Sequence, residues 1–449
     1  MSLRQVTDFE APEVRETEKR LKSALDICVE ALKRQGAERF VTTATKNEVN
    51  EFNIDGGEFS LFRTTFSYNL SVTAYVGKKK GTATVNKLDR ETIEKAVISA
   101  VDSAKIARED DAWVVAPFVP AKKFIKGSPF CDVDRLFMRT NELLETIKRE
   151  YPLIMLEQVI VSHHSTVSFY RNSSGTEEVQ HAGKYNADLC YSGHDGDECS
   201  SFNGSSCDAE NLDRPFIEAG LMRRELEDTQ KQIYTEPFEG KETGVLVAVP
   251  NLFEELLESA FGSFSGDFYL LNDTAIWRDK VGQRVADEKL TVAYNVSEPG
   301  LIIPQTLTGE GYETEDYTFI ENGVLKCLAA SSYVANKKGV DRAKNSGGAT
   351  VITPGDRSLG DIIKSIKKGI FVGRFSGGEP ASNGDFSGIA KNSFLIEDGK
   401  ITKALSETMI SGNLEQLVNN IAAISKETVC DGSSVLPYGA FYGVTISGK

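Results

Sequence analysis

At 449 residues, the chain is long enough for two or three domains with a large buried core. Its net charge of −15 argues against non-specific binding to nucleic-acid phosphates, which needs clustered Lys and Arg. The charged N-terminus lacks the apolar segment of a signal peptide, and no apolar stretch approaches the ~20 residues of a membrane helix. We therefore expect a cytoplasmic protein that binds neither nucleic acid nor membranes directly.

The first part of the chain predicts amphipathic helices separated by strands. Residues 13–35 place their apolar side chains on one helix face, and Gly36 ends the pattern. A second helix is predicted from Asp89 to about Arg108. Between them, the turn signal Asp55-Gly56-Gly57 predicts a hairpin. The predicted strands around this turn are 39–44, 48–54, 58–66 and 69–76.

The same order of elements then recurs roughly 120 residues further on. A helix is predicted at 133–150, followed by strands on either side of a turn at 172–175. The similarity is one of pattern and not of residue identity, so internal duplication and coincidence both remain open. A long helix predicted at 212–232 closes this half.

The second half is rich in short strands punctuated by glycine. Its central stretch, Gly244–Phe268, predicts a buried strand and then an apolar-striped helix from Leu252, with Asn251 as the N-cap. Another helix is predicted at 414–426. Mixed strands with segregated helices predict an α+β protein with a curved or barrel-like sheet in this half. We expect an N-terminal domain at 1–232 and a C-terminal domain at 240–449.

The N-terminal half also carries a group of residue types that zinc prefers. Three cysteines lie near all four histidines, but they lack the close pairing of structural zinc sites. Hairpin surface residues and buried thiols are therefore the favoured interpretation. The residues concerned are His163, His164, His181, His194, Cys190, Cys199 and Cys207.

The C-terminal half contains no histidine, so it cannot build a Ser-His-Asp or Cys-His catalytic group by itself. Glu258, on the polar face of the central helix, is its best-placed carboxylate. Glu254 and Glu255 share that face, so a solvated acidic surface is the alternative. Cys430 is a second candidate, and a lone buried thiol is its alternative.

Several motifs of this half resemble the TldD/PmbA family, whose members were first described as proposed modulators of DNA gyrase. The residues that carry the resemblance are Ser382–Phe386, Asn392–Ile401, Glu315–Lys326 and Ile410–Asn413. The resemblance implies a two-domain α+β fold and two kinds of subunit. The TldD kind is a zinc metallopeptidase that carries H-E-x-x-x-H on the helix after a strand, with a ligand cysteine near the C-terminus. The PmbA (TldE) kind lacks this motif.

Alignment through Gly266–Phe268 places Leu257 and Gly262 where the TldD kind has histidines. Glu258 takes the place of the motif glutamate, and Cys430 falls near that of the ligand cysteine. One carboxylate and one thiol without imidazoles cannot make a three-ligand zinc site with an open position. The resemblance therefore implies a PmbA/TldE-like chain without a cofactor, with zinc only in a TldD-like partner.

The sequence thus predicts a non-catalytic subunit of a TldD-type zinc metallopeptidase system that acts on peptides or unfolded proteins, in proteolysis or peptide maturation. Its expected partners are a TldD-like catalytic subunit, a second copy of itself in a dimer, and peptide substrates. Two alternatives stay open. One is a peptidase in its own right, through Glu258 and Cys430 or through unrecognised carboxylates. The other is a protein-binding regulator such as a modulator of DNA gyrase.

Overall fold

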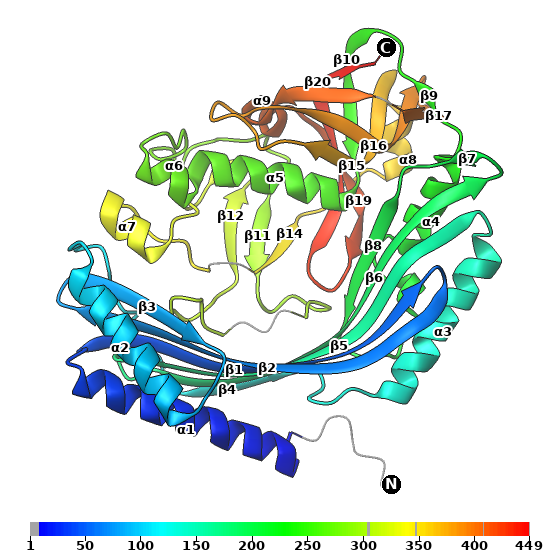
Figure 1. Ribbon diagram of the computed structural model, residues 1–449. Coiled ribbons are helices and arrows are strands. Elements are labelled where there is room, and N and C mark those ends of the chain that lie inside the picture. The colour runs from blue at the N-terminus through cyan, green and yellow to red at the C-terminus, as the bar shows by residue number, and fades with distance from the viewer. Residues whose placement is uncertain (1–8, 303–305, 346–347, 407, 449) are drawn as a thin grey trace.

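The computed structural model describes residues 9–302, 306–345, 348–406 and 408–448. It confirms a two-domain α+β fold, with a broad curved sheet below and a second, β-rich body above (Figure 1). Within these residues the helices are α1 (Pro12–Arg34), α2 (Arg90–Ile106), α3 (Val133–Glu150), α4 (Met222–Lys231), α5 (Pro250–Ser265), α6 (Asp267–Leu271), α7 (Ser332–Lys338), α8 (Leu359–Lys364) and α9 (Leu414–Asn419).

The broad sheet belongs to the N-terminal half. In the described part of the chain its strands are β1 (Arg39–Asp55), β2 (Glu58–Val76), β3 (Lys79–Val85), β4 (Lys122–Lys126), β5 (Ile154–Asn172), β6 (Glu177–Asp195), β7 (Glu198–Cys199) and β8 (Asn203–Ala209). Their order is β3-β2-β1-β5-β6-β4, and β7 and β8 also pair with β6. Two long antiparallel hairpins, β1–β2 and β5–β6, therefore lie side by side and form most of the sheet.

These strands are longer than the sequence predicts. Residues 39–44 and 48–54 belong to the single strand β1, and 58–66 and 69–76 belong to β2. The polar residues 45–47 interrupt the apolar pattern without ending the strand, because β1 is hydrogen-bonded on both sides over this stretch. The ladder bonds of a central strand are made by backbone N–H and C=O groups, so a short run of polar side chains does not end it.

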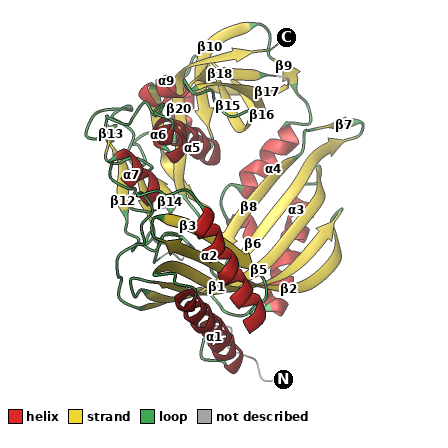
Figure 2. Ribbon diagram, turned by 60° about the vertical axis from the view of Figure 1, so that its left-hand side comes forward, coloured by secondary structure: helices red, strands yellow, loops and turns green. Residues whose placement is uncertain are grey.

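Helices cover one face of this sheet in two groups (Figure 2). One core cluster gathers apolar residues of α1, α2 and the first hairpin, including Leu25, Val97 and Leu70, all fully buried. A second cluster joins α3 to the second hairpin, as with Leu143 and Val161. Burial of each such side chain contributes about 1.5–3 kcal/mol.

The order of helix, long hairpin, short third strand and helix occurs twice in this half. It runs α1-β1-β2-β3-α2 and then α3-β5-β6-β8-α4, with β7 as a short ribbon beside the end of β6. The closing helix is shorter than predicted. Residues 212–232 contain a 3-10 turn at Phe216–Glu218 before α4 begins.

The C-terminal half forms a second sheet. Its strands within the described residues are β9 (Glu236–Pro237), β10 (Lys241–Ala248), β11 (Val292–Asn295), β12 (Tyr317–Glu321), β13 (Val324–Leu325), β14 (Ala349–Ile352), β15 (Lys368–Gly377), β16 (Asp385–Glu397), β17 (Lys400–Ser406), β18 (Met409–Asn413), β19 (Ile421–Cys430) and β20 (Val435–Ser447). Successive pairings β10-β15-β16-β18-β20-β10 close a barrel, which confirms the predicted barrel-like sheet.

One helix prediction in this half is wrong beyond its first turns. Residues 414–419 form α9, but the chain becomes strand β19 at Ile421. The apolar spacing continues through Leu417 and Ile421, which made the segment look helical. Pairing of β19 with β20 overrides that local pattern.

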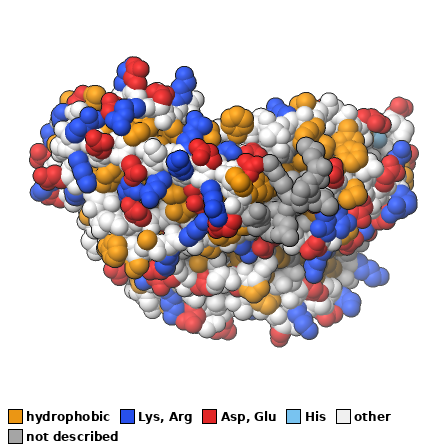
Figure 3. All heavy atoms as spheres, turned by 90° about the horizontal axis from the view of Figure 1, so that it is seen from below, with side chains coloured by type: hydrophobic (Ala, Val, Ile, Leu, Met, Phe, Trp, Pro, Cys, Tyr) orange, Lys and Arg blue, Asp and Glu red, His pale blue; other side chains and the backbone are white. Residues whose placement is uncertain are grey.

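Acidic and basic side chains are interspersed on the face seen from below in Figure 3. The ion pairs agree with this mixture, for example Arg34 with Glu94 and Lys123 with Glu18. On this face the charged side chains are therefore mixed and do not form one acidic surface.

Candidate functional site

The central strand and helix of the sequence analysis are β10 and α5. The helix begins with Pro250 at its first position and Val249 as the N-cap, so the predicted cap at Asn251 is wrong. Proline suits the first helical position because its fixed φ is already helical and its missing N–H would be unpaired there. The apolar stripe predicted along α5 is confirmed by buried Leu252, Leu256 and Phe264.

The two positions of the missing motif histidines face different surroundings. Leu257 is fully buried in the C-terminal core, on the same helix as buried Phe253 and Phe261. Gly262 is exposed, and a Cβ built there would meet no atom within 4 Å. Position 257 is therefore a packing position in this fold, whereas position 262 is open.

Glu258 lies on the opposite, acidic face of α5. Tyr294 on β11 donates a 2.7 Å hydrogen bond from its hydroxyl to the Glu258 Oε1 atom, and the Thr350 hydroxyl on β14 lies 3.5 Å from the same atom. Glu258 is solvent-accessible, but the surrounding protein reduces its hydration and raises the pKa of its carboxyl. Burial also raises the pKa of Tyr294.

One turn earlier, Glu254 connects α5 to the loop between β19 and β20. Its Oε1 atom accepts a 2.9 Å hydrogen bond from the hydroxyl of Ser434. Burial raises the pKa of Glu254, and its neighbour Glu255 shifts in the same direction for the same reason. A row of acidic side chains with raised pKa values thus lines this face, which is common at functional sites but is not specific to them.

Glu258 opens on a cavity of about 290 Å³. Its wall combines carboxylates, tyrosines and one arginine with small apolar residues. Besides Glu258 and Tyr294, the lining residues are Asp267, Thr308, Glu310, Tyr317, Phe319, Ala329, Ala330, Ser331, Arg342, Ala343 and Asn345. Two of the acids already have partners, since Asp267 accepts from the Ser331 N–H and Glu310 accepts from the Ser332 hydroxyl.

Cys430, the other candidate, ends β19 and is exposed, so the buried-thiol alternative is wrong. Its Sγ lies 3.8 Å from the carbonyl oxygen of Gly300. Four residues on, Ser434 reaches Glu254, so the Cys430 loop does approach α5. Among the contacts of the described residues, however, no hydrogen bond joins Cys430 to Glu258.

Zinc does not fit these residues. Leu257 is enclosed by core side chains and Gly262 has no side chain, so neither position supplies a ligand. Glu258 is engaged by a tyrosine hydroxyl, and the nearest partner of Cys430 is a backbone carbonyl. Across the part of the chain that the structure describes, no group of three or more His, Cys, Asp or Glu residues is arranged to hold a metal ion.

The four histidines are also kept apart. His163 is buried and its Nε2 lies 3.2 Å from the carbonyl oxygen of Ser128, while His164 pairs with the Ser162 hydroxyl. The other two have their own partners, with His181 against Glu18 at 2.6 Å and His194 against Ser192 at 2.9 Å. All four lie on the single hairpin β5–β6, where their partners indicate structural roles.

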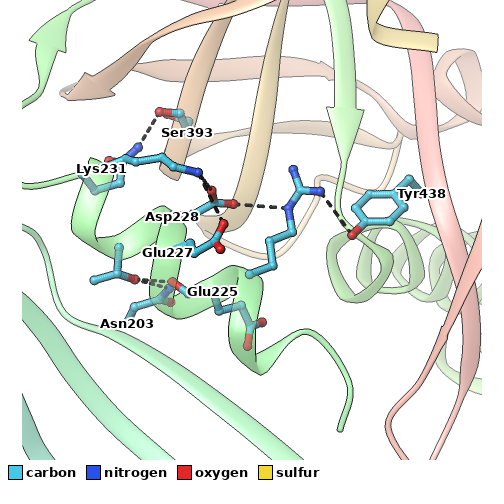
Figure 4. Close-up of polar contacts among 10 residues, drawn as sticks. Asn203, Glu225, Glu227, Asp228, Lys231, Ser393 and Tyr438 are labelled. Atoms are coloured by element: carbon cyan, nitrogen blue, oxygen red, sulfur yellow. Dashed lines mark hydrogen bonds and ion pairs between the residues drawn. The ribbon is translucent and has the colours of Figure 1, made fainter. Parts of the chain in front are cut away.

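The helix α4 connects the two sheets (Figure 4). Gln232, just after α4, donates a 2.6 Å hydrogen bond to the Ser393 carbonyl on β16, and Arg224 lies over the ring of Tyr438 on β20. On the other side of α4, Glu225 accepts a 2.5 Å hydrogen bond from Ser205 on β8. Burial raises the pKa of Glu225 to about 7.

A second bridge between the halves lies at α7. The ring of Tyr333 stacks on Trp113 with centroids 3.9 Å apart, and its hydroxyl donates a 2.9 Å hydrogen bond to Asp110. Lys337 of the same helix pairs with Asp110 at 2.8 Å. These contacts join the C-terminal half, which carries the cavity, to the N-terminal half. They do so through a helix that is distant in sequence from α4.

Sequence reasoning found Glu254 and Glu258 but missed the residues that surround them. Tyr294, Thr350 and Ser434 come from three segments that lie 36 or more residues from their glutamate partner. Nothing in a local pattern marks such residues. Only the pairing of β11, β14 and β20 brings them to one helix face.

The fold is similar to solved structures over nearly its whole length. TldE from Thermococcus kodakarensis superposes with a TM-score of 0.82 at 23% identity, over 95% of this chain and 100% of that one. A proposed modulator of DNA gyrase from Bacteroides thetaiotaomicron gives a TM-score of 0.84 at 21% identity, over 98% and 100%. These likenesses define the class as a two-domain fold shared with TldE.

Family models give the assignment within that class. The PmbA/TldA metallopeptidase C-terminal domain matches residues 242–448, and PmbA/TldA metallopeptidase domain 1 matches residues 44–104. The chain belongs to the PmbA/TldD family, as its motifs predicted.

Several relatives with sequence similarity are named as metalloproteases. One from Methanocaldococcus jannaschii is 27% identical over 190 residues, which span 40% of this chain and 42% of that protein. A PmbA homolog from Haemophilus influenzae is 22% identical over 435 residues, or 91% of this chain and 92% of that protein. Of the helices in the described ranges, none is long and apolar enough to cross a membrane.

Proposed function

We propose that this chain is a non-catalytic, PmbA/TldE-like subunit of a cytoplasmic, TldD-type zinc metallopeptidase system. The observation that carries the proposal is the packing of α5. Leu257 fills the core at the position of the first motif histidine, and Gly262 leaves the second position empty. The helix therefore keeps its place in the fold without the ligands that zinc hydrolysis needs.

In this proposal the chain binds and positions peptides or unfolded segments for a TldD-like catalytic partner. The cavity beside α5 supports such a role because it combines carboxylates, hydroxyls and aromatic faces in a concave site. Glu258 and Tyr294 present a carboxylate–hydroxyl pair at its wall. Because the hydroxyl proton is directed at Glu258, the remaining lone pairs of the carboxylate and of the hydroxyl oxygen can accept hydrogen bonds from peptide N–H groups.

One observation favours a second candidate, a peptidase in its own right. The raised pKa of the Glu258 carboxyl, in a cavity, is the property expected of a general acid or base. Against this candidate, no imidazole or thiol within the described ranges hydrogen-bonds to Glu258. A regulatory role on another protein, such as the gyrase modulation proposed for the Bacteroides protein, is the remaining alternative.

The discriminating experiment is a peptide-cleavage assay with three samples: this chain alone, a TldD-like chain with H-E-x-x-x-H alone, and their mixture. We expect no cleavage by this chain alone and a change in rate or substrate range in the mixture. The control is the Glu258→Gln variant. Chelator-resistant cleavage by the isolated parent chain, lost in Glu258→Gln, would establish the second candidate instead.

A further inference from the structure

The cavity beside α5 is lined by more negative than positive groups. Three carboxylates, those of Glu258, Asp267 and Glu310, contribute to its wall, against the single guanidinium of Arg342. Among the ion pairs of the described residues, none involves any of these three carboxylates. The chain therefore places an excess of acidic groups in this cavity without a basic side chain bound to them.

The guanidinium of Arg342 is engaged elsewhere. It lies over the ring of Tyr312, 3.8 Å from the ring centroid. Its Nη1 atom donates hydrogen bonds to the carbonyl oxygens of Ala343 at 2.7 Å and Lys344 at 3.0 Å. None of these partners is a carboxylate, so Arg342 does not neutralise the acids of the cavity by direct contact.

Two carboxylate oxygens in the cavity remain available to a ligand. Tyr294 donates to the Oε1 atom of Glu258, and the Ser331 N–H donates to the Oδ1 atom of Asp267 at 2.8 Å. Within the described ranges, no hydrogen bond reaches the second oxygen of either carboxylate. Glu258 Oε2 and Asp267 Oδ2 can therefore each accept a hydrogen bond from a bound molecule.

Three aromatic side chains, Tyr294, Tyr317 and Phe319, also line the cavity. They come from β11 and β12, which are paired and lie beside α5 (Figure 1). The rings of Tyr294 and Tyr317 are stacked with centroids 5.5 Å apart, whereas Phe319 lies edge-on to Tyr294 at 5.8 Å and 74°. Aromatic faces attract cations, as carboxylates do, so both components of this wall favour a positively charged ligand.

The size of the cavity and its free oxygens indicate which cation fits. A volume of about 290 Å³ is at the small end for ligand sites, which suits one side chain or one chain end. The free oxygens belong to two separate carboxylates. An ammonium has three donors that point apart and can bond to both, whereas a guanidinium fork matches the two oxygens of one carboxylate. The alanines of the wall, Ala329, Ala330 and Ala343, can contact the aliphatic carbons that carry such an ammonium.

We propose that this cavity binds a primary alkylammonium group of a peptide, held by the carboxylates of Glu258 and Asp267 and by the faces of the three aromatic rings. A lysine side chain and a free peptide N-terminus both carry this group. The proposal rests on the peptide-positioning role given above, and it names the class of peptide that the site selects.

The first test is isothermal titration calorimetry of the full chain with pentapeptides of alanine that are acetylated at the N-terminus and amidated at the C-terminus. Their central residue is lysine, Nε-acetyllysine, norleucine or arginine. We expect the lysine peptide to bind about tenfold more tightly than the acetyllysine and norleucine peptides, which keep an aliphatic chain but lack the charge. The arginine peptide should bind more weakly than the lysine peptide.

A fifth peptide distinguishes the two sources of the ammonium. It carries norleucine at the centre and a free N-terminus. If it binds as tightly as the blocked lysine peptide, the cavity accepts a chain end. If it binds as weakly as the blocked norleucine peptide, the ligand is the lysine side chain. Either result supports the proposal when the lysine or the free-terminus peptide exceeds the blocked norleucine peptide.

The second test removes the charges of the cavity one at a time. Glu258→Gln and Asp267→Asn keep an oxygen for Tyr294 and for the Ser331 N–H, respectively, so the local contacts are retained. Each should weaken the lysine peptide by about three- to tenfold and change the norleucine peptide by less than about twofold. The matched control is Glu288→Gln, which removes the same charge from an exposed residue outside the cavity and should leave both affinities unchanged.

Several results would overturn the proposal: no measurable binding of either ammonium-bearing peptide, equal binding of the blocked lysine, free-terminus and blocked norleucine peptides, tighter binding of arginine than of lysine, or equal effects of Glu288→Gln and Asp267→Asn. These measurements use this chain alone, so they separate the proposal from the proposed function. A changed cleavage rate in the mixture with a TldD-like chain, without any preference for an ammonium, refutes only the cation site. Ammonium-selective binding without an effect on the partner's cleavage refutes only the subunit role.

Discussion

Replacing Leu257 by histidine is the sharpest probe of why this chain lacks a zinc site. Leu257 is fully buried, and removing such a side chain costs about 3–5 kcal/mol. Imidazole keeps part of the volume but brings polar nitrogens without partners, which adds about 1–3 kcal/mol. We expect Leu257→His to reduce the free energy of unfolding by about 3–6 kcal/mol, a large fraction of a domain's stability.

Urea unfolding followed by tryptophan fluorescence measures this change. Trp277 is a suitable reporter because it is fully buried beside Phe264, with ring centroids 5.2 Å apart, in the same core as Leu257. The loss should grow as the pH falls below ~6.5, since a buried imidazole has a lowered folded pKa and the unfolded chain then binds the extra proton.

Gly262→His is the matched control on the same helix. A side chain there meets open space, and histidine has a better helix propensity than glycine. Its stability should stay within about 0.5 kcal/mol of the parent or rise slightly. If Leu257→His cost less than about 1 kcal/mol, or if both substitutions cost the same, the packing explanation for position 257 would be refuted.

Two further predictions concern stability. Gly183→Ala should destabilise the N-terminal half by about 1–3 kcal/mol in urea unfolding, because its Cβ would lie 1.7 Å from the Ser128 carbonyl oxygen. Gly378→Ala, with no atom within 4 Å of the new Cβ, should be neutral, and equal losses would contradict the clash. Glu225 has a folded pKa near 7 against an ordinary 4.5, so its burial lowers stability progressively as pH rises from about 4.5 to 7. Glu225→Gln should remove this pH dependence from the melting temperature between pH 5 and 8 and raise stability at pH 8 by up to about 3 kcal/mol, whereas an unchanged pH profile would contradict it.

The sequence predicted the parts of the fold that local patterns encode. The apolar stripe of α5 was visible because a helix buries every third or fourth residue whatever it packs against. The paired glycines Gly56 and Gly57 predict the hairpin turn, because such turns need positive φ and few other residues tolerate it. Both glycines do have positive φ. The barrel was anticipated only as a class, since its closure depends on β20 pairing with both β10 and β18.

Where tertiary pairing decides, local patterns fail. Ile421 continues a helical spacing yet starts a strand, because β20 offers it a partner. Asn251 is a good cap by composition, but the helix begins at Pro250, two residues before the predicted start at Leu252. The environment of Glu258 was invisible for the same reason, because Tyr294 and Thr350 reach it through the sheet and not along the chain.

Part of the sequence interpretation stays a prediction. The domain limits 1–232 and 240–449, the absence of a cofactor and the identity of the partner rest on the residues and on the family. Cys430 is exposed, so its thiol is accessible to a substrate. In the described chain, however, no hydrogen bond joins it to Glu258. The arrangement of α5 bears most directly on these predictions, because it decides whether a metal can be held.

Metal content of the purified full chain tests the central proposal most directly. The protein is dialysed against excess zinc, freed of unbound metal on a desalting column, and measured by inductively coupled plasma mass spectrometry. With Leu257 in the core and Gly262 without a side chain, we expect well below one zinc per chain and no peptide cleavage by the same sample. One full equivalent of zinc retained together with peptidase activity would contradict the proposal.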